Sequence, residues 1–209
     1  MILHRDARCV VVDKPSGVAT HRGWDGGEVE PLLQRVRDAV NAYVYPVHRL
    51  DRGASGCVLF ALDADAAAAF AKAWPEADKV YLAVTRGHPA DQVIDHPIPR
   101  SPETPERVPA VTAIRGLDTF GRYALVEARP QTGRLHQIRR HLKHVSCPII
   151  GDVRYGKGEH NRLFRAHGLA RLALHCTSIA VAHPDGGRLE VACALAPDIT
   201  SAIASVKAG

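Results

Sequence analysis

Short aliphatic runs separated by turns are the feature that most constrains the fold of this 209-residue chain. Segments typical of β-strands are 8–12, 57–62, 80–84, 123–128, 173–182 and 188–194. Segments typical of helices are 30–42, 64–74 after a capping Asp63, 134–145, and 198–206 after Pro197. The helices do not alternate strictly with the strands, as they would around a parallel sheet. We therefore predict an α+β fold with a mixed, largely antiparallel sheet flanked by helices and loops.

Turn-forming residues punctuate this pattern. Gly186-Gly187 separates the last two predicted strands and predicts a hairpin turn. The five prolines between positions 97 and 109 predict one extended surface loop.

The segment His48-Arg49-Leu50-Asp51-Arg52-Gly53-Ala54-Ser55-Gly56 carries the clearest chemical signal. It places one carboxylate, that of Asp51, between two guanidinium groups in a glycine-containing turn before a strand. Nearby cations keep a carboxylate ionised, and small turn residues let a large substrate approach the backbone. This arrangement suits a nucleophile or base that acts on a polyanion. The structural alternative is a surface aspartate that caps a turn or pairs with Arg49 or Arg52.

The same segment resembles the signature of the RluA-type pseudouridine synthases. Five further blocks resemble that family's pattern in the family's order: Asp13-Lys14-Pro15-Ser16-Gly17, Lys79-Val80-Tyr81-Leu82-Ala83, Thr132-Gly133-Arg134-Leu135-His136-Gln137-Ile138-Arg139, Pro148-Ile149-Ile150-Gly151-Asp152 and Leu172-Ala173-Leu174-His175. The resemblance extends from about residue 9 to residue 195. It implies the pseudouridine synthase catalytic fold in a single domain over residues 1–209, with no extra N-terminal RNA-binding domain. The substrate implied is a uridine within structured RNA.

The resemblance also assigns roles to individual residues. It makes Asp51 the catalytic residue, either as a nucleophile at the anomeric carbon or as a base toward a sugar proton. Tyr81 becomes the aromatic that stacks on the uracil, although a strand tyrosine is more often packing. Arg139 becomes the partner of the catalytic aspartate, and Arg49 takes the place of the flipped base. Ala54 departs from the family, which usually has a hydroxyl residue there.

The predicted helix over 134–145 has two contrasting faces. One face is apolar, and the other carries Arg134, Arg140, Lys143 and His144. A basic face is often simply solvated, but the formal net charge of +5 and the pI near 9.1 favour a polyanionic partner. Arg139 adjoins the apolar face, so we expect it to be partly buried beside a carboxylate. The predicted RNA-binding residues are Arg49, Arg52, Arg134, Arg140, Lys143, Lys157 and Arg162.

Two runs are most similar to the tRNA pseudouridine synthase C branch of the family: Val18-Ala19-Thr20-His21-Arg22 and the sequence from Gly151 to Arg162. This similarity implies tRNA uridine 65, in the T stem, as the target. A large-subunit ribosomal RNA uridine is the alternative target. A non-catalytic RNA-binding protein on the same scaffold is a second alternative. A glycoside hydrolase is less well supported, because such enzymes typically need two acidic residues.

Other classes lack their signals. No phosphate-binding glycine-rich loop and no dinucleotide fingerprint is present, so we expect no cofactor. His136, His141, His144 and Cys147 do not have common zinc spacing, so we expect no metal. The five cysteines are scattered, and no leader or apolar run of about 18 residues occurs. We expect a cytoplasmic monomer with free thiols and no membrane contact.

Overall fold

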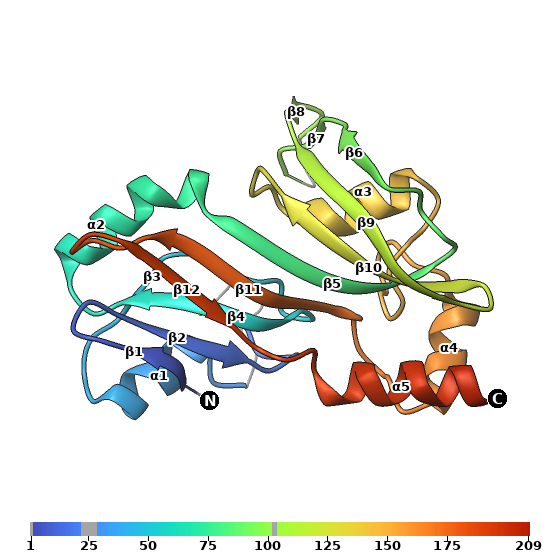
Figure 1. Cartoon of the computed structure of the whole chain (residues 1–209), viewed down its shortest axis with the longest axis horizontal. Coiled ribbons are helices and arrows are strands. Elements are labelled where there is room, and N and C mark those ends of the chain that lie inside the picture. The colour runs from blue at the N-terminus through green and yellow to red at the C-terminus, as the bar shows by residue number, and fades with distance from the viewer. Residues whose placement is uncertain (1, 22–28, 102–103) are drawn as a thin grey trace. The chain divides into compact units, whose positions relative to one another are not determined.

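A computed structural model describes residues 2–21, 29–101 and 104–209 (Figure 1). The described chain forms two compact units. Unit 1 comprises residues 1–79 and 176–194, and unit 2 comprises residues 80–175 and 195–209. Arg22, in the run similar to the tRNA branch, and Pro102, in the predicted loop, lie outside the described residues.

Unit 1 is built on antiparallel strands. Its strands and helices are β1 (Ile2–Arg5), β2 (Cys9–Lys14), α1 (Leu32–Val40), β3 (Tyr45–Pro46), β4 (Ser55–Ala61), α2 (Ala64–Ala73), the 3-10 turn η1 (Trp74–Glu76), most of β11 (Leu174–Ala182) and β12 (Arg188–Ala192). The strand order is β1-β2-β4-β11, with β3 paired to β4 and β12 paired to β11. The β2–β4 register places Lys14 opposite Gly56. This register brings the loop after β2 beside the turn before β4.

Unit 2 contains a second antiparallel set. It comprises β5 (Asp78–Arg86, from Val80 onward), β6 (Gln92–Asp95), β7 (Ile98–Pro99), β8 (Arg107–Val108), β9 (Val111–Phe120), β10 (Tyr123–Pro130), α3 (Gln137–His144), α4 (Gly158–Ala166) and α5 (Pro197–Ala208). The strand order is β5-β10-β9-β6, and β7 pairs with β8 separately. The β5–β10 register places Tyr81 opposite Ala128. Helix α3 packs on β9 and β10.

Aliphatic side chains fill the interior of each unit. All seven residues of β4 are buried, as are Cys9 to Val12 of β2. Helix α1 buries Leu32, Val36 and Val40, which share one face at a spacing of four. Helix α2 begins where the Asp63 side chain accepts the N–H of Ala66 at 2.7 Å, as the sequence predicts.

The predicted α+β class with a largely antiparallel arrangement is confirmed. The six predicted strands and four predicted helices all occur, with shifted ends. Gly186 and Gly187 both have positive φ at the β11–β12 hairpin, also as predicted. The prediction that the 97–109 stretch is only a loop is wrong, because β7 and β8 pair within it.

One predicted helix begins later than expected. The segment 134–145 becomes helical only at Gln137, because His136 takes the left-handed conformation with φ 54° and ψ 29°. A residue in this region cannot continue a right-handed helix. The residues before it form a loop instead.

No helix within the described ranges has both the length and the apolar character needed to cross a membrane.

Candidate active site

Asp51 lies in a tight turn of unit 1, four residues before β4. The backbone N–H of Ala54 donates to the carbonyl oxygen of Asp51 at 3.0 Å and closes the turn. The Asp51 side chain is partly exposed, whereas Leu50 and Ala54 on either side are buried. The turn is therefore anchored by its apolar neighbours and presents its carboxylate at the surface of the unit.

The buried side chain of Lys14 supports this turn through hydrogen bonds. The side chain of Lys14 has no exposed surface, and its ammonium donates to the carbonyl oxygens of Pro15 at 2.9 Å, Val18 at 2.7 Å and Arg52 at 3.3 Å. A buried charge costs free energy unless hydrogen bonds satisfy it, and these carbonyls do so. Lys14 thus ties the loop after β2 to the turn that carries Asp51.

Further bonds join the same two segments. The N–H of Gly17 donates to the Arg52 carbonyl at 2.8 Å, and Nε of Arg52 donates back to the Gly17 carbonyl at 2.9 Å. The Ser16 hydroxyl donates to the Gly53 carbonyl at 2.7 Å. The Asp13 to Gly17 block, for which we predicted no role, therefore supports the turn that carries Asp51.

Two residues of the signature have structural roles. Gly56 has φ +109°, and a Cβ there would lie 2.2 Å from the Cys176 carbonyl oxygen on β11. The close approach of β11 excludes any larger residue. Nε2 of His48 accepts the N–H of Leu59 at 3.1 Å, and the ring stacks on Trp74 at 4.2 Å. His48 is therefore a structural hydrogen-bonding residue.

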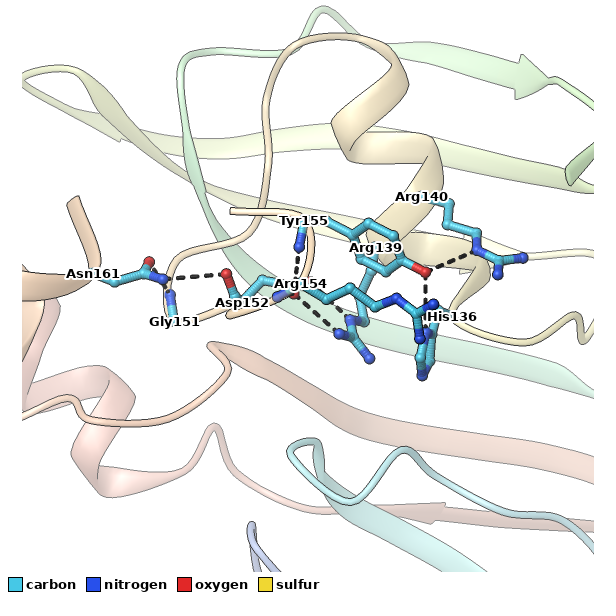
Figure 2. Close-up of polar contacts among 8 residues, drawn as sticks. All are labelled: His136, Arg139, Arg140, Gly151, Asp152, Arg154, Tyr155 and Asn161. Atoms are coloured by element: carbon cyan, nitrogen blue, oxygen red, sulfur yellow. Dashed lines mark hydrogen bonds and ion pairs between the residues drawn. The ribbon is translucent and has the colours of Figure 1, made fainter. Parts of the chain in front are cut away.

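Arg139 of α3 is the central cation of unit 2 (Figure 2). It is 9 % exposed, and its guanidinium binds the Asp152 carboxylate through two bonds, Nε to Oδ2 at 2.7 Å and Nη2 to Oδ1 at 3.0 Å. Such a two-bond fork fixes the orientation of the guanidinium as well as its position. The expected burial of Arg139 beside a carboxylate is confirmed.

The loop around Asp152 holds that carboxylate rigidly. Its Oδ1 also accepts the N–H groups of Arg154 at 2.9 Å and Tyr155 at 3.0 Å. Asn161 of α4 donates to the Asp152 carbonyl at 3.1 Å and accepts the Gly151 N–H at 2.8 Å. Burial alone would raise the pKa of Asp152, but the bonds from Arg139 and from the two N–H groups outweigh it and lower the pKa.

The Tyr155 hydroxyl connects Arg140 and His136. Nε of Arg140 donates to the Tyr155 hydroxyl oxygen at 3.0 Å, and that hydroxyl lies 3.2 Å from Nδ1 of His136 (Figure 2). The Tyr155 ring also lies 5.1 Å from the guanidinium carbon of Arg139. A second bond, from Arg140 to the Pro99 carbonyl at 2.8 Å, fixes the other end of that side chain.

The Thr132 to Arg139 block is held by Gln137. Its Oε1 accepts from the Thr132 hydroxyl at 2.6 Å and from the Arg134 N–H at 3.0 Å. Its Nε2 donates to the Val111 carbonyl and the Thr112 hydroxyl, both at 2.9 Å. The first two bonds hold the loop before α3, and the other two attach the start of α3 to β9.

The predicted site residues fall in both units. Asp51, Arg49 and Arg52 belong to unit 1, and the remaining ones belong to unit 2. Tyr81 is half-buried in the middle of β5. Among the predicted RNA contacts, Arg140 is half-buried, and the exposed ones are Arg49, Arg52, Arg134, Lys143, Lys157 and Arg162. The pairing of Asp51 with Arg139 stays a prediction.

Sequence reasoning gave no role to Lys14, Gln137, Asp152, Tyr155 or Asn161. Each lies in or next to one of the blocks that resemble the family's pattern, and this position is the signal that could have indicated a role. The pairing of Lys14 with Arg52 and that of Asp152 with Arg139 could not be read from residue order, because folding brings together residues that are distant in the sequence.

One cluster in unit 1 has the residue types of a metal site. Ligand atoms of His4, Asp6 and Cys9 lie within 4.8 Å of one another. Asp6 already accepts from His4 at 2.7 Å and from the N–H groups of Arg8 and Cys9. Burial and the Asp6 charge raise the pKa of the Cys9 thiol to about 12, so it is a poor source of thiolate. Hydrogen bonds account for this cluster.

Comparisons with known proteins identify the family to which the chain belongs. Residues 8–144 match the family described as RNA pseudouridylate synthase. The chain is 38% identical to tRNA pseudouridine synthase C of Vibrio cholerae over 208 residues, covering 88% of this chain and 85% of that protein. It is also 38% identical to tRNA pseudouridine synthase C of Haemophilus influenzae, covering 88% and 87%.

A solved structure agrees with the fold. The human RNA pseudouridylate synthase domain containing 4 superposes with a TM-score of 0.79 at 27% identity, covering 98% of this chain and 92% of that one. Sequence and structure thus give the same answer: the chain belongs to the RNA pseudouridylate synthase family and is an isomerase that acts on RNA.

Proposed function

We propose that this RNA pseudouridine synthase modifies tRNA, and that its target is uridine 65 in the T stem. The observation that carries the proposal is the similarity to relatives named tRNA pseudouridine synthase C, which extends over most of both chains. The basic character of the chain supports an RNA partner. A monomer in the cytoplasm fits this role, and the five free cysteines suit a reducing compartment.

The proposed chemistry centres on Asp51. Its carboxylate either attacks the anomeric carbon of the target uridine or removes a neighbouring sugar proton. The bond between that carbon and the base nitrogen breaks, and the uracil turns. Its carbon five bonds to the anomeric carbon, while Asp51 leaves that carbon or returns the sugar proton. The freed nitrogen takes up a proton. The proton on carbon five then leaves. Tyr81 would hold the detached uracil by stacking on it.

The proposed role of Arg139 is to pair with Asp51. An arginine has five N–H donors, and the fork to Asp152 engages Nε and Nη2. A guanidinium can bind two carboxylates at once, so the pairing with Asp152 is compatible with the proposed pairing with Asp51. Arg49 would fill the space that the flipped base leaves in the RNA.

The test is release of tritium from RNA labelled at uridine carbon five. Wild type and Asp51→Asn are compared on unmodified tRNA and on ribosomal RNA. We expect release from tRNA alone, and less than a few per cent of it in Asp51→Asn, because the variant removes the reacting charge. RNA affinity should stay within a few-fold, because no phosphate contact is lost. Asp65→Asn, an exposed carboxylate in the first turn of α2, is the control and should match wild type.

Three outcomes would contradict the proposal. Release from ribosomal RNA only would keep the reaction but replace the target. Equal turnover by Asp51→Asn would remove Asp51 from the chemistry. A tRNA whose position 65 is changed to cytidine, and which still releases tritium, would move the target to another uridine.

A further inference from the structure

We propose that Asp152 and Tyr155 are positioning residues that set the two neighbouring arginines of α3 for different tasks. Asp152 fixes Arg139 for the reaction, and Tyr155 fixes Arg140, together with His136, for holding the RNA. The inference rests on the proposed role of Arg139 and adds the residues through which that role is controlled. Both positioning residues lie on the loop between α3 and α4 (Figure 2).

Asp152 holds the Arg139 guanidinium in one fixed geometry. The fork to Arg139 has two short bonds, and two backbone N–H groups bind the same carboxylate. The Asp152 side chain is fully buried, so water cannot take the place of a lost partner. A carboxylate held by four donors has little freedom to move, and it passes this rigidity to the guanidinium.

The backbone around Asp152 adds to this rigidity. A Cβ on Gly151 would lie 1.9 Å from the Arg171 carbonyl oxygen, and one on Gly156 would lie 2.4 Å from the Asp152 carbonyl oxygen. Neither position admits a larger side chain without moving backbone. The loop therefore has close backbone contacts on both sides of the carboxylate.

The Tyr155 end binds through one hydroxyl. The oxygen accepts from Nε of Arg140, which leaves the hydroxyl proton for Nδ1 of His136. His136 sits in the left-handed region just before α3, where a side chain other than glycine costs about 1 kcal/mol or more. The Tyr155 contact helps to hold this unfavourable conformation. Tyr155 thereby links the entry of α3 to its basic face.

Because Asp152 and Tyr155 have separate tasks in this proposal, removing them should change different kinetic constants. Removing the Asp152 charge leaves Arg139 in place but free to rotate, which lowers kcat, because misplacement by about 1 Å can cost 100-fold. Removing the Tyr155 hydroxyl leaves the ring and the Asp152 fork, so it raises KM and spares kcat. A general loss of structure would move both constants together in both variants.

The experiment measures tritium release from tRNA, with kcat and KM determined for Asp152→Asn and Tyr155→Phe. We expect Asp152→Asn to lower kcat about 100-fold with KM within a few-fold. We expect Tyr155→Phe to raise KM by roughly 5- to 10-fold with kcat within two-fold. We also expect the acidic limb of the pH profile of kcat to move to higher pH in Asp152→Asn, because a loosened Arg139 favours the ionised nucleophile or base less. Tyr155→Phe should leave that limb unchanged.

The chain offers a matched control for the ion pair. Arg171 and Asp198 form the same two-bond fork in unit 2, with Nε to Oδ2 at 2.8 Å and Nη2 to Oδ1 at 2.7 Å. Asp198→Asn removes a fork of the same geometry whose carboxylate is 43% exposed rather than fully buried, and we expect wild-type kcat and KM. If Asp152→Asn does not fold, Asp152→Glu replaces it, because it keeps the charge and moves it by one methylene. The expectation is then a kcat loss of about 10-fold at unchanged KM.

The results separate this inference from the proposed function. Asp152→Asn with kcat no lower than that of Asp198→Asn, or with equal changes in kcat and KM, would overturn the positioning role. A Tyr155→Phe variant that loses kcat instead of KM would overturn the division of tasks. Failure of the proposed function would show itself in the wild type, as absent release from tRNA or as full turnover by Asp51→Asn.

Discussion

At the scale of single residues, burial decides the charge of His48. The ring stacks on Trp74, and burial, helped by the nearby Lys79 cation, lowers its pKa to about 3. The ring is therefore neutral at physiological pH, which leaves Nε2 able to accept the Leu59 N–H. In the unfolded chain the ordinary histidine pKa of 6.5 applies. The stabilisation is complete above pH 6.5 and is lost as the pH falls toward 3.

We therefore predict an acid-dependent loss of stability that His48→Gln reduces. Between pH 7 and pH 5 the proton uptake of unfolded His48 costs about 1–2 kcal/mol of unfolding free energy. Glutamine can accept the same N–H and does not titrate. Urea unfolding at the two pH values should show a smaller difference for His48→Gln than for wild type. His88→Gln, at an exposed position, is the control, and a difference equal to the wild type in both variants would contradict the prediction.

The sequence predicted the environment of Arg139 better than its partner. Its place beside the apolar face of a helix was enough to expect a buried guanidinium and a carboxylate. The carboxylate in unit 2 is Asp152, thirteen residues further along the chain. That contact depends on how the loop after α3 returns over the helix, which no local pattern specifies. Residue types predict a need for a partner, and tertiary structure supplies it.

At the scale of elements, the approach of β11 to β4 depends on one missing side chain. Gly56 is the second residue of the buried strand β4, and a methyl group there would overlap the Cys176 backbone, with its nitrogen at 2.6 Å and its oxygen at 2.2 Å. Backbone atoms cannot move aside as the end of a flexible side chain can. The two strands must separate to admit an alanine, and Asp51 lies on the turn that enters β4.

We predict that Gly56→Ala destabilises the protein by about 3 kcal/mol or more, because overpacking adds to the cost of positive φ. Gly121→Ala, in the β9–β10 turn at φ +58°, has nothing within 4 Å of the new Cβ and should cost about 1 kcal/mol. Urea unfolding of both variants measures the difference. Equal losses would mean that β11 can retreat freely from β4.

Among the elements that escaped prediction, β9 and α4 did so for related reasons. Strand β9 mixes Thr112, Arg115, Gly116 and Asp118 with few large aliphatic residues, because one of its faces is exposed. Helix α4 begins at Gly158, and its buried residues are His160, Asn161 and Phe164. Hydrogen bonds satisfy its buried polar groups, such as Asn161 to the Gly151–Asp152 backbone. Hydrophobic periodicity cannot detect an element whose buried face is polar.

At the scale of the whole molecule, the net charge of +5 favours attraction to RNA. The partner of each cation within the protein decides whether that cation is available to bind a phosphate. Lys207 pairs with Asp118, and Arg188 pairs with Asp78. Arg140 is half-buried, and its bonds to Tyr155 and Pro99 hold it in one orientation without neutralising its charge. On the predicted basic face of α3 and the loop before it, Lys143 and Arg134 remain exposed, although Arg134 donates one bond to the Pro109 carbonyl.

The final prediction concerns the salt dependence of RNA binding by this exposed pair. Each phosphate contact contributes roughly 0.7–0.9 to the slope of log affinity against log salt concentration. The double variant Arg134→Gln, Lys143→Gln should therefore lower the slope by about 1.5 and weaken binding to all RNAs alike. The control, Lys207→Gln with Arg188→Gln, removes the same formal charge from cations that already face carboxylates, so its slope should equal that of wild type. Filter binding of tRNA at several salt concentrations measures both slopes. If both double variants lower the slope equally, RNA responds to the net charge alone, and the basic face makes no phosphate contact of its own.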